Sequence, residues 1–241
     1  MLYFVKLNYI CAMKADVPYV NIHKHSDSEQ GEIALKNLFL AEYYSIANDK
    51  IQNFSVGFHP WQTKVETHVA EVKKGLEIAA FSAQVVALGE TGLDKAVSNP
   101  FEKQLQIFKA HIEVSETYRK PLIIHCVRAF QEVFTIRKEL KASQTWIFHG
   151  FNGSAQLAMQ IISSGCIVSF GNAILNEGTR ATHSLLHLHP EHFFLETDDS
   201  AIAISTIYEM ASRITQLSRH ELAVRLYANF VRLFGKLNTT V

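Results

Sequence analysis

The sequence predicts an α/β protein with a single (β/α)8 barrel, and three observations lead to this fold class. Short β-rich runs alternate with longer helical patterns, which favours a parallel sheet. Eight strand candidates occur in roughly 220 residues, the number that a barrel of this size needs. No glycine-rich phosphate turn occurs of the kind found at the crossing point of an open doubly wound sheet.

The strand candidates are short apolar runs rich in β-branched and aromatic residues. In chain order they cover 19–23, 32–40, 53–58, 84–89, 121–126, 145–150, 166–171 and 192–197. The helical patterns cover 63–81, 99–118, 128–141, 154–164, 173–187, 203–217 and 219–234. In the last of these, apolar residues recur every fourth position from Leu222 to Phe234, which is helix spacing. Asn99 followed by Pro100 predicts a helix N-cap and a proline at the first helical position.

No linker, repeat or low-complexity segment divides the chain, so we expect one domain over residues 18–241. Residues 1–17 are predicted to be an N-terminal extension, since Met13 stands a few residues before the first convincing strand. The opening segment is apolar but is interrupted by Lys6, and no cleavage site follows a basic region. We therefore do not expect a signal peptide.

Charge and cysteine content restrict the possible partners and location. Lys and Arg total 23, as do Asp and Glu, so no basic field exists to hold nucleic acid by charge alone. Three scattered cysteines, Cys11, Cys126 and Cys166, indicate reduced thiols and a cytoplasmic location. No apolar run is long enough to predict a membrane span. No obligate protein partner is evident.

Side chains able to bind metal recur where predicted strands end. They are His23 and His25, then Glu90, His125 and His149, and finally Glu196 and Asp198. In a barrel the carboxyl ends of all strands open onto one face, so we expect these residues to converge. Four histidines with two or three carboxylates suit a pair of divalent cations, such as Zn²⁺, Mn²⁺ or Mg²⁺.

A single histidine at a strand end is more often a hydrogen-bonded structural residue, so the metal hypothesis depends on the recurrence. The remaining histidines of the helical patterns are expected on solvent-facing surfaces: His68, His111, His183, His187 and His220. Cys126 beside His125 is not read as a nucleophile, because adjacent strand residues point to opposite faces.

From Tyr19 to Phe234 the motifs resemble the TatD-type metal-dependent deoxyribonucleases of the amidohydrolase superfamily. The similar segments are His23-Lys24-His25, "VGFHP" (56–60), "GETGLD" (89–94) with Gln104 and Phe108, "PLIIHC" (121–126), "HGFNGS" (149–154), "LETD" (195–198) and "ANFVRLF" (228–234). Their order matches that of the family, which makes the combined signal specific.

The resemblance implies a two-metal hydrolase that cuts phosphodiester bonds, acting on DNA ends or small phosphodiesters as an exodeoxyribonuclease. By the family pattern, His23, His25 and Asp198 hold one cation and His125 and His149 the other, with Glu90 bridging. Divalent cations lower the pKa of water toward roughly 7, and Asp198 is expected to take its proton. His59 and Arg128 are expected to contact substrate. Glu196 is expected to orient the metal ligands as a hydrogen-bond acceptor.

Four features differ from the family pattern, among them Lys95 in place of an aromatic residue and "LETDDS" in place of "LETDSP", and a second activity stays open. Only about thirty residues separate His25 from "GFHP", which predicts a distorted barrel with an abbreviated second βα unit and a short or irregular second strand. Arg128 follows His125 by three positions rather than the usual two. The alternative is an amidohydrolase-type enzyme that cleaves an aminoacyl ester (as in D-aminoacyl-tRNA), an amide or a lactone with the same metals.

Overall fold

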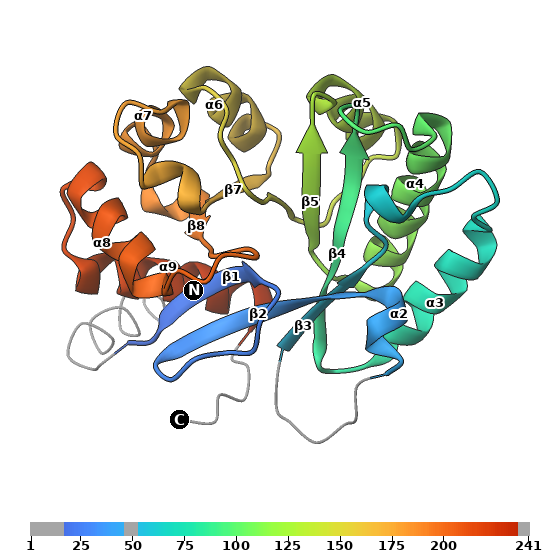
Figure 1. Ribbon diagram of the computed structural model, residues 1–241, viewed down its shortest axis with the longest axis horizontal. Coiled ribbons are helices and arrows are strands. Elements are labelled where there is room, and N and C mark those ends of the chain that lie inside the picture. Colours follow the sequence, from blue (N-terminus) through green and yellow to red (C-terminus); the bar gives the residue numbers. More distant parts are fainter. Residues whose placement is uncertain (1–16, 46–52, 236–241) are drawn as a thin grey trace. The chain divides into compact units, whose positions relative to one another are not determined.

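The computed structural model describes residues 17–45 and 53–235, which Figure 1 traces in colour along the chain. They fall into two compact units. Unit 1 comprises residues 17–34, 150–163 and 168–235, and unit 2 comprises residues 35–45, 53–149 and 164–167. Each unit alternates strands with helices, and the strands follow the chain order from β1 to β8 in the sheet.

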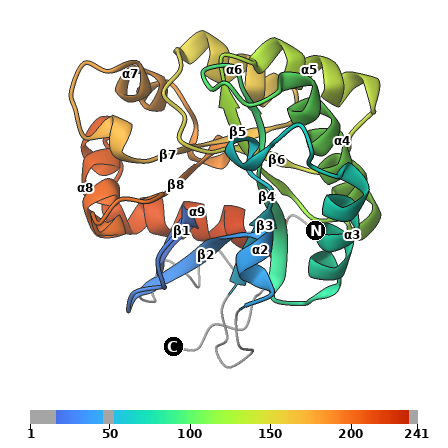
Figure 2. The same ribbon diagram turned by 45° about the vertical axis from the view of Figure 1, so that its right-hand side comes forward.

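Unit 2 consists of parallel strands joined by helices. Its elements are β2 (Glu32–Phe39, from Leu35 on), α2 (Leu40–Tyr43), β3 (Asn53–Gly57), the 3₁₀ turn η1 (Pro60–Gln62), α3 (Val69–Phe81), β4 (Val85–Asp94), α4 (Phe101–Tyr118), β5 (Leu122–Val127), α5 (Phe130–Glu139) and β6 (Trp146–Phe148). Successive strands from β2 to β6 pair in parallel. Helices α3 and α4 pack on each other and on β4, as Figure 2 shows.

Strand β4 carries the information that matters most for function. All but one of its ten residues are buried, as expected for a parallel strand covered on both faces. Three of the buried residues are nevertheless polar: Glu90, Thr91 and Asp94. Buried carboxylates require specific partners, because an unpaired buried charge is very costly. The C-terminal half of β4, which carries these carboxylates, is therefore the first candidate for a functional site in unit 2.

Unit 1 contains the first strand and the C-terminal third of the chain. Its elements are β1 (Tyr19–Lys24), α6 (Ala155–Ser163), β7 (Ile167–Phe170, from Val168 on), the 3₁₀ turns η2 (Asn172–Ile174) and η3 (Pro190–His192), α7 (Arg180–Leu186), β8 (Phe193–Leu195), α8 (Ile204–Thr215) and α9 (Arg219–Phe234). Strands β7 and β8 pair in parallel. The buried Tyr208 hydroxyl ties α8 to β1 by donating to the Val20 carbonyl (3.2 Å) and accepting its N–H (3.0 Å).

Each of the eight predicted strands and seven predicted helices has a counterpart, but three boundaries differ clearly, and the first is the start of α3 at Val69 instead of residue 63. Helix α7 starts at Arg180, seven residues after the predicted start, because η2 and a turn precede it. Strand β4 ends at Asp94 instead of residue 89. Its glycines do not end the strand; they allow close approach to β5. A Cβ at Gly92 would lie 2.0 Å from the His125 carbonyl oxygen, so only glycine fits there.

The second βα unit is abbreviated in its helix and not in its strand. Helix α2 has four residues in the described part of the chain, and residues 46–52 lie outside it. The expectation of a short or irregular second strand is wrong, since β2 has eight residues and pairs with β3 in unbroken register from Leu35 to Phe39. The shorter link between His25 and "GFHP" therefore leaves the strand intact.

The predicted N-cap role of Asn99 is also wrong. Helix α4 begins at Phe101, and the position before it is Pro100, which makes no side-chain cap. The Asn99 amide instead donates to the carbonyl oxygens of Trp61 and Thr63, both at 2.8 Å. The Asn99 side chain therefore holds a loop that is distant in sequence and does not cap its own helix.

No helix in residues 17–45 and 53–235 is both long and apolar enough to cross a bilayer. The predicted N-terminal extension, residues 1–17, lies outside the described residues except for its last one.

Candidate metal centres

In unit 2, three imidazoles surround the carboxylate of Glu90. The Nε2 atom of His149 lies 2.6 Å from Glu90 Oε1, the Nδ1 atom of His125 lies 2.8 Å from it, and the Nε2 atom of His59 lies 3.0 Å from it. The four side chains are 6–12% exposed. One carboxylate oxygen is thus the meeting point of four segments. Glu90 and His125 belong to β4 and β5, and His59 and His149 directly follow β3 and β6.

This donor set fits a divalent cation. One carboxylate oxygen offers about two lone pairs, so it does not accept three strong hydrogen bonds at once. Imidazole nitrogen and carboxylate oxygen are ordinary Zn²⁺ ligands, and Mn²⁺ also accepts both. A cation bound among these atoms would replace the crowded contacts at Oε1. We call this group, His59, Glu90, His125 and His149, the unit 2 centre.

The backbone around Glu90 is held by a buried polar contact. The Glu90 N–H donates to the Asn37 side-chain oxygen on β2 (2.7 Å), which also accepts from the Ser55 hydroxyl on β3 (3.0 Å). Asn37 and Ser55 are fully or almost fully buried. Rigid placement of a ligand by such contacts reduces the cost of assembling a metal site.

His59 lies deeper than a residue at the rim of a pocket. It is 5% exposed, and its Nδ1 atom accepts the Trp61 backbone N–H (3.1 Å) while Nε2 faces Glu90. Burial lowers the pKa of His59, and the contact with Glu90 only partly opposes this effect. A neutral imidazole is the form that binds metal. His59 is therefore a candidate ligand, and its contact with substrate stays a prediction.

Asp94 completes the unit 2 centre and was missed by the sequence analysis. Its Oδ2 atom lies 3.1 Å from His125 Nε2 and accepts the Trp61 indole N–H at 2.7 Å. If His125 donates Nε2–H to Asp94, its Nδ1 lone pair is directed at Glu90 and is available to a cation. Burial raises the pKa of Asp94, but hydrogen bonds from Trp61, Ala96 and His125 outweigh burial and lower it.

In unit 1, two imidazoles share one carboxylate oxygen. The chain after β8 runs beside β1, with the Asp198 N–H donating to the His23 carbonyl (2.9 Å) and the His25 N–H donating to the Asp198 carbonyl (3.1 Å). As strand alternation predicts, the side chains of His23 and His25 lie together, with ring centroids 5.2 Å apart. Their Nε2 atoms each lie 3.4 Å from Asp198 Oδ1.

These separations are those of ligands around a small cation. Tetrahedral ligands at 2.0–2.1 Å from Zn²⁺ are separated by roughly 3.3 Å, close to the 3.4 Å between each imidazole nitrogen and Asp198 Oδ1. His23 is fully buried, whereas His25 and Asp198 are 31% and 40% exposed. This group, the unit 1 centre, is therefore open to water on one side. Catalytic metal sites keep such an open position.

Two further carboxylates are buried in unit 1. Glu196 is fully buried and accepts the Gly150 backbone N–H (2.6 Å) and the Ser169 hydroxyl, so it holds the segment that follows His149. Glu32 forms a buried ion pair with Lys24 (2.7 Å), the residue between His23 and His25. Both carboxylates already have polar partners, and the orienting role of Glu196 toward the metal ligands stays a prediction.

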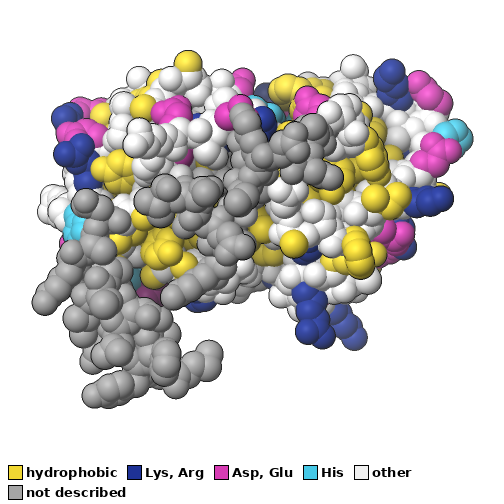
Figure 3. Space-filling model, turned by 90° about the horizontal axis from the view of Figure 1, so that it is seen from below, with side chains coloured by type: hydrophobic (Ala, Val, Ile, Leu, Met, Phe, Trp, Pro, Cys, Tyr) yellow, Lys and Arg dark blue, Asp and Glu magenta, His cyan; other side chains and the backbone are white. Residues whose placement is uncertain are grey.

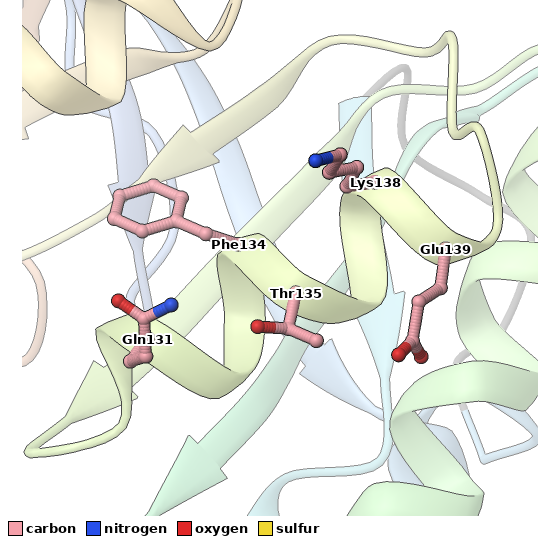
Figure 4. Close-up of a pocket in the computed structure, with 5 residues that line it drawn as sticks. All are labelled: Gln131, Phe134, Thr135, Lys138 and Glu139. Atoms are coloured by element: carbon pink, nitrogen blue, oxygen red, sulfur yellow. The ribbon is translucent and has the colours of Figure 1, made fainter.

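A pocket on the outer side of α5 does not share this chemistry. Figure 4 shows the five residues that line it, Gln131, Phe134, Thr135, Lys138 and Glu139, all on that helix. It offers one carboxylate and no imidazole. No cluster of histidine and carboxylate atoms among the described residues includes any of the five.

A family model, described as TatD-related DNase, matches residues 34–235. The chain belongs to the TatD-related DNase family. A relative from Buchnera aphidicola, named an uncharacterized metal-dependent hydrolase, is 27% identical over 198 residues, which are 75% of this chain and 73% of that protein.

Solved TatD structures confirm the predicted fold class. The crystal structure of YjjV, a TatD homologue from Escherichia coli K12, has a TM-score of 0.80 at 20% identity and covers 92% of this chain and 100% of its own. A hydrolase of the TatD family from Entamoeba histolytica gives 0.71 at 17% identity, over 90% and 98%. The chain is thus a single α/β domain of eight parallel strands with the TIM-type barrel fold.

Two further residues of the TatD motifs have clear environments. Arg128 is exposed in the turn after β5, in a left-handed conformation with φ of 54°. Burial raises the pKa of the neighbouring Cys126 to about 12, so it remains a thiol at neutral pH. A nucleophilic role requires the thiolate, so Cys126 is not a candidate nucleophile.

Of the five histidines expected on solvent-facing surfaces, four are exposed: His68, His183, His187 and His220. The expectation is wrong for His111, which is fully buried in α4. Its Nε2 atom accepts the Phe58 N–H (3.0 Å), and Nδ1–H donates to the Ile107 carbonyl (2.9 Å). His111 therefore fixes the backbone directly before the candidate ligand His59.

Replacing His111 with glutamine should flatten the pH dependence of stability. Burial lowers the pKa of His111 to about 4 from an ordinary value of 6.5. Between these values the unfolded chain binds more protons than the folded one. The free energy of unfolding therefore falls as the pH drops through this window, by on the order of 3 kcal/mol. Glutamine keeps one donor and one acceptor but does not titrate.

Urea unfolding at pH 7 and pH 4.5 measures this contribution. The wild type should lose more stability between the two values than His111→Gln, by about 2–3 kcal/mol. All other titrating groups are common to the two proteins and cancel in the difference. An identical loss in both would mean that His111 is protonated in the folded protein or is not buried.

Proposed function

We propose that the protein is a metal-dependent hydrolase that cleaves phosphodiester bonds, as a TatD-like exodeoxyribonuclease acting on DNA ends or small phosphodiesters. The observation that carries this proposal is the pair of centres, in which five imidazoles lie against the carboxylate oxygens of Glu90 and Asp198. Family membership supports the same chemistry. Each centre has the donor set for one divalent cation, of which Zn²⁺, Mn²⁺ and Mg²⁺ are the candidates.

Divalent cations, when bound, polarise a phosphoryl oxygen and lower the pKa of water from 15.7 toward about 7. Asp198 is the group that we assign as base. Its side chain is 40% exposed, so water reaches it, and a carboxylate within hydrogen-bond reach of an attacking water can take its proton. Arg128, exposed three residues after His125, is assigned to the negative charge of the substrate phosphate.

The surface charge favours small or terminal substrates over long duplexes. Lys and Arg equal Asp and Glu in number, and Figure 3 shows side chains of both signs interspersed on one face. Duplex binding depends on many phosphate contacts with Lys and Arg. We therefore propose that the substrate is held locally, through one phosphate at a metal centre. The two described cysteines are free, which is consistent with the cytoplasmic location proposed from the sequence.

Metal analysis combined with a substrate screen tests the proposal. The purified protein should carry up to two divalent cations per chain. It should hydrolyse single-stranded DNA or bis-nitrophenyl phosphate in preference to lactones and aminoacyl esters. Hydrolysis of a lactone or an aminoacyl ester without phosphodiesterase activity would replace the proposal with the amidohydrolase alternative.

Chelation should abolish the activity. Imidazole and carboxylate ligands alone cannot lower the pKa of water as a cation does, so metal-free protein is expected to lose at least about 100-fold in kcat. Dialysis against a chelator, followed by addition of Zn²⁺, Mn²⁺ or Mg²⁺ separately, measures the loss and identifies the metal that restores turnover. Full activity in protein shown to be metal-free would contradict a metal mechanism.

A further inference from the structure

Trp61 is largely exposed to solvent, yet its polar atoms are all hydrogen-bonded to the protein. Its side chain is 60% exposed, although a large aromatic ring gains free energy by burial. The other tryptophan, Trp146, is fully buried. Neither the metal-binding role of the unit 2 centre nor the packing of unit 2 requires an exposed indole at this position.

Every polar atom of Trp61 is bonded to the protein. Its backbone N–H donates to His59 Nδ1 (3.1 Å), and its carbonyl accepts from the Asn99 amide (2.8 Å). Its indole N–H donates to Asp94 Oδ2 (2.7 Å). The ring is therefore fixed in the folded protein, so a ligand that contacts its face does not have to immobilise it.

The fixed ring stands directly beside the unit 2 centre. Its centroid lies 4.9 Å from that of His59 and 5.8 Å from that of His125, with the ring planes steeply inclined to both. The indole thus meets the imidazoles edge to face, and the exposed part of the ring is the part not covered by them. A flat group attached to a phosphate at this centre can reach it.

We propose that Trp61 is a stacking platform for a nucleobase of the substrate, and that it makes the enzyme prefer nucleotide phosphodiesters to phosphodiesters without a base. This inference rests on the proposed phosphodiesterase function and specifies its substrate class. Every base has a π-face, so a platform of this kind accepts any of them without reading sequence. Base–aromatic stacking corresponds to about a tenfold change in affinity or more.

Two variants separate stacking from a purely structural role of the indole N–H. Trp61→Phe keeps an aromatic ring and removes the bond to Asp94. Trp61→Gln keeps a donor for Asp94 and removes the ring. With thymidylyl-(3′→5′)-thymidine as substrate, we expect Trp61→Gln to raise KM about tenfold or more with kcat little changed, and Trp61→Phe to stay within about threefold of wild type.

Intrinsic fluorescence gives a readout that does not depend on turnover. Trp61 is the exposed one of two tryptophans, so thymidine 5′-monophosphate should quench the emission of the wild type, whereas deoxyribose 5-phosphate should not. Equal effects of the two ligands, or no quenching by either, would overturn the platform. A larger defect in Trp61→Phe than in Trp61→Gln would overturn it as well, in favour of the structural role.

The two readouts also distinguish this inference from the proposed function. Quenching by thymidine 5′-monophosphate without hydrolysis of any phosphodiester would support the platform and refute the phosphodiesterase. Hydrolysis of the dinucleotide with an unchanged KM in Trp61→Gln would support the phosphodiesterase and refute the platform.

Discussion

Replacing Asp198 with asparagine is expected to remove nearly all hydrolysis while the protein stays folded. The amide has the same shape as the carboxylate but cannot take a proton from water, and loss of a general base costs about 10²–10⁴-fold in kcat. The backbone bonds that join Asp198 to His23 and His25 do not involve the side chain, so the local structure should persist. Steady-state kinetics with bis-nitrophenyl phosphate measures the loss, and urea unfolding verifies the fold.

Asp199 provides the matched control for this variant. It carries the same side chain one residue further on, but it is exposed in the turn that follows. Asp199→Asn should therefore keep kcat within a few-fold of wild type. The opposite pattern, in which Asp199→Asn is inactive and Asp198→Asn is active, would show that the assignment is wrong by one residue and that Asp198 is not the base.

Two residues of the unit 1 centre could be anticipated from short-range geometry, and the third from the family resemblance. Alternation along one strand places His23 and His25 on the same side, whereas the resemblance to the TatD family selected Asp198 over Asp199. The structure brings these three side chains together. The alternation argument needs only the strand period of two, but it could not select Asp198, because β8 ends at Leu195 and Asp198 is left-handed with φ of 55°.

The errors came from residues whose partners are distant in sequence. His111 has the spacing of a surface helix residue, but its imidazole accepts the N–H of Phe58, 53 residues earlier. Asn99 looks like a helix cap, yet it holds the carbonyls of the loop at Trp61. Local propensity cannot reveal such contacts, because a polar side chain satisfied by tertiary structure has the same sequence signature as a solvated one.

Asp94 differs from His111 and Asn99, because the sequence contained a signal for its position. The glycines of "GETGLD" suggested that the strand stops at residue 89, but β4 continues to Asp94. Asp94 lies four positions after Glu90, so in an extended strand the two side chains share a face. Reading the glycines as positions of close approach to β5, instead of as a turn, would have placed both carboxylates beside His125.

Glu90 should therefore be the residue whose loss most disrupts the unit 2 centre. Three imidazoles lie 2.6–3.0 Å from its Oε1 atom, and a neutral amide in its place removes the negative charge that would offset a divalent cation. Glu90→Gln is expected to lower the metal content after dialysis by at least one cation per chain and to reduce kcat by at least about 100-fold.

Two further variants show whether this loss follows from contact with the imidazoles. Asp94→Asn keeps every candidate ligand but weakens the orientation of His125, and loss of such a supporting carboxylate typically costs about 10–100-fold in metal affinity. Glu132→Gln removes an exposed carboxylate of unit 2 that pairs with Lys95 and touches none of the imidazoles, so its metal content should equal that of wild type. The expected order of metal loss is Glu90→Gln, then Asp94→Asn, then Glu132→Gln.

If Glu90→Gln retained as much metal as Glu132→Gln, the imidazoles around Oε1 would form a hydrogen-bonded structural cluster, and the unit 2 centre would not be a metal site.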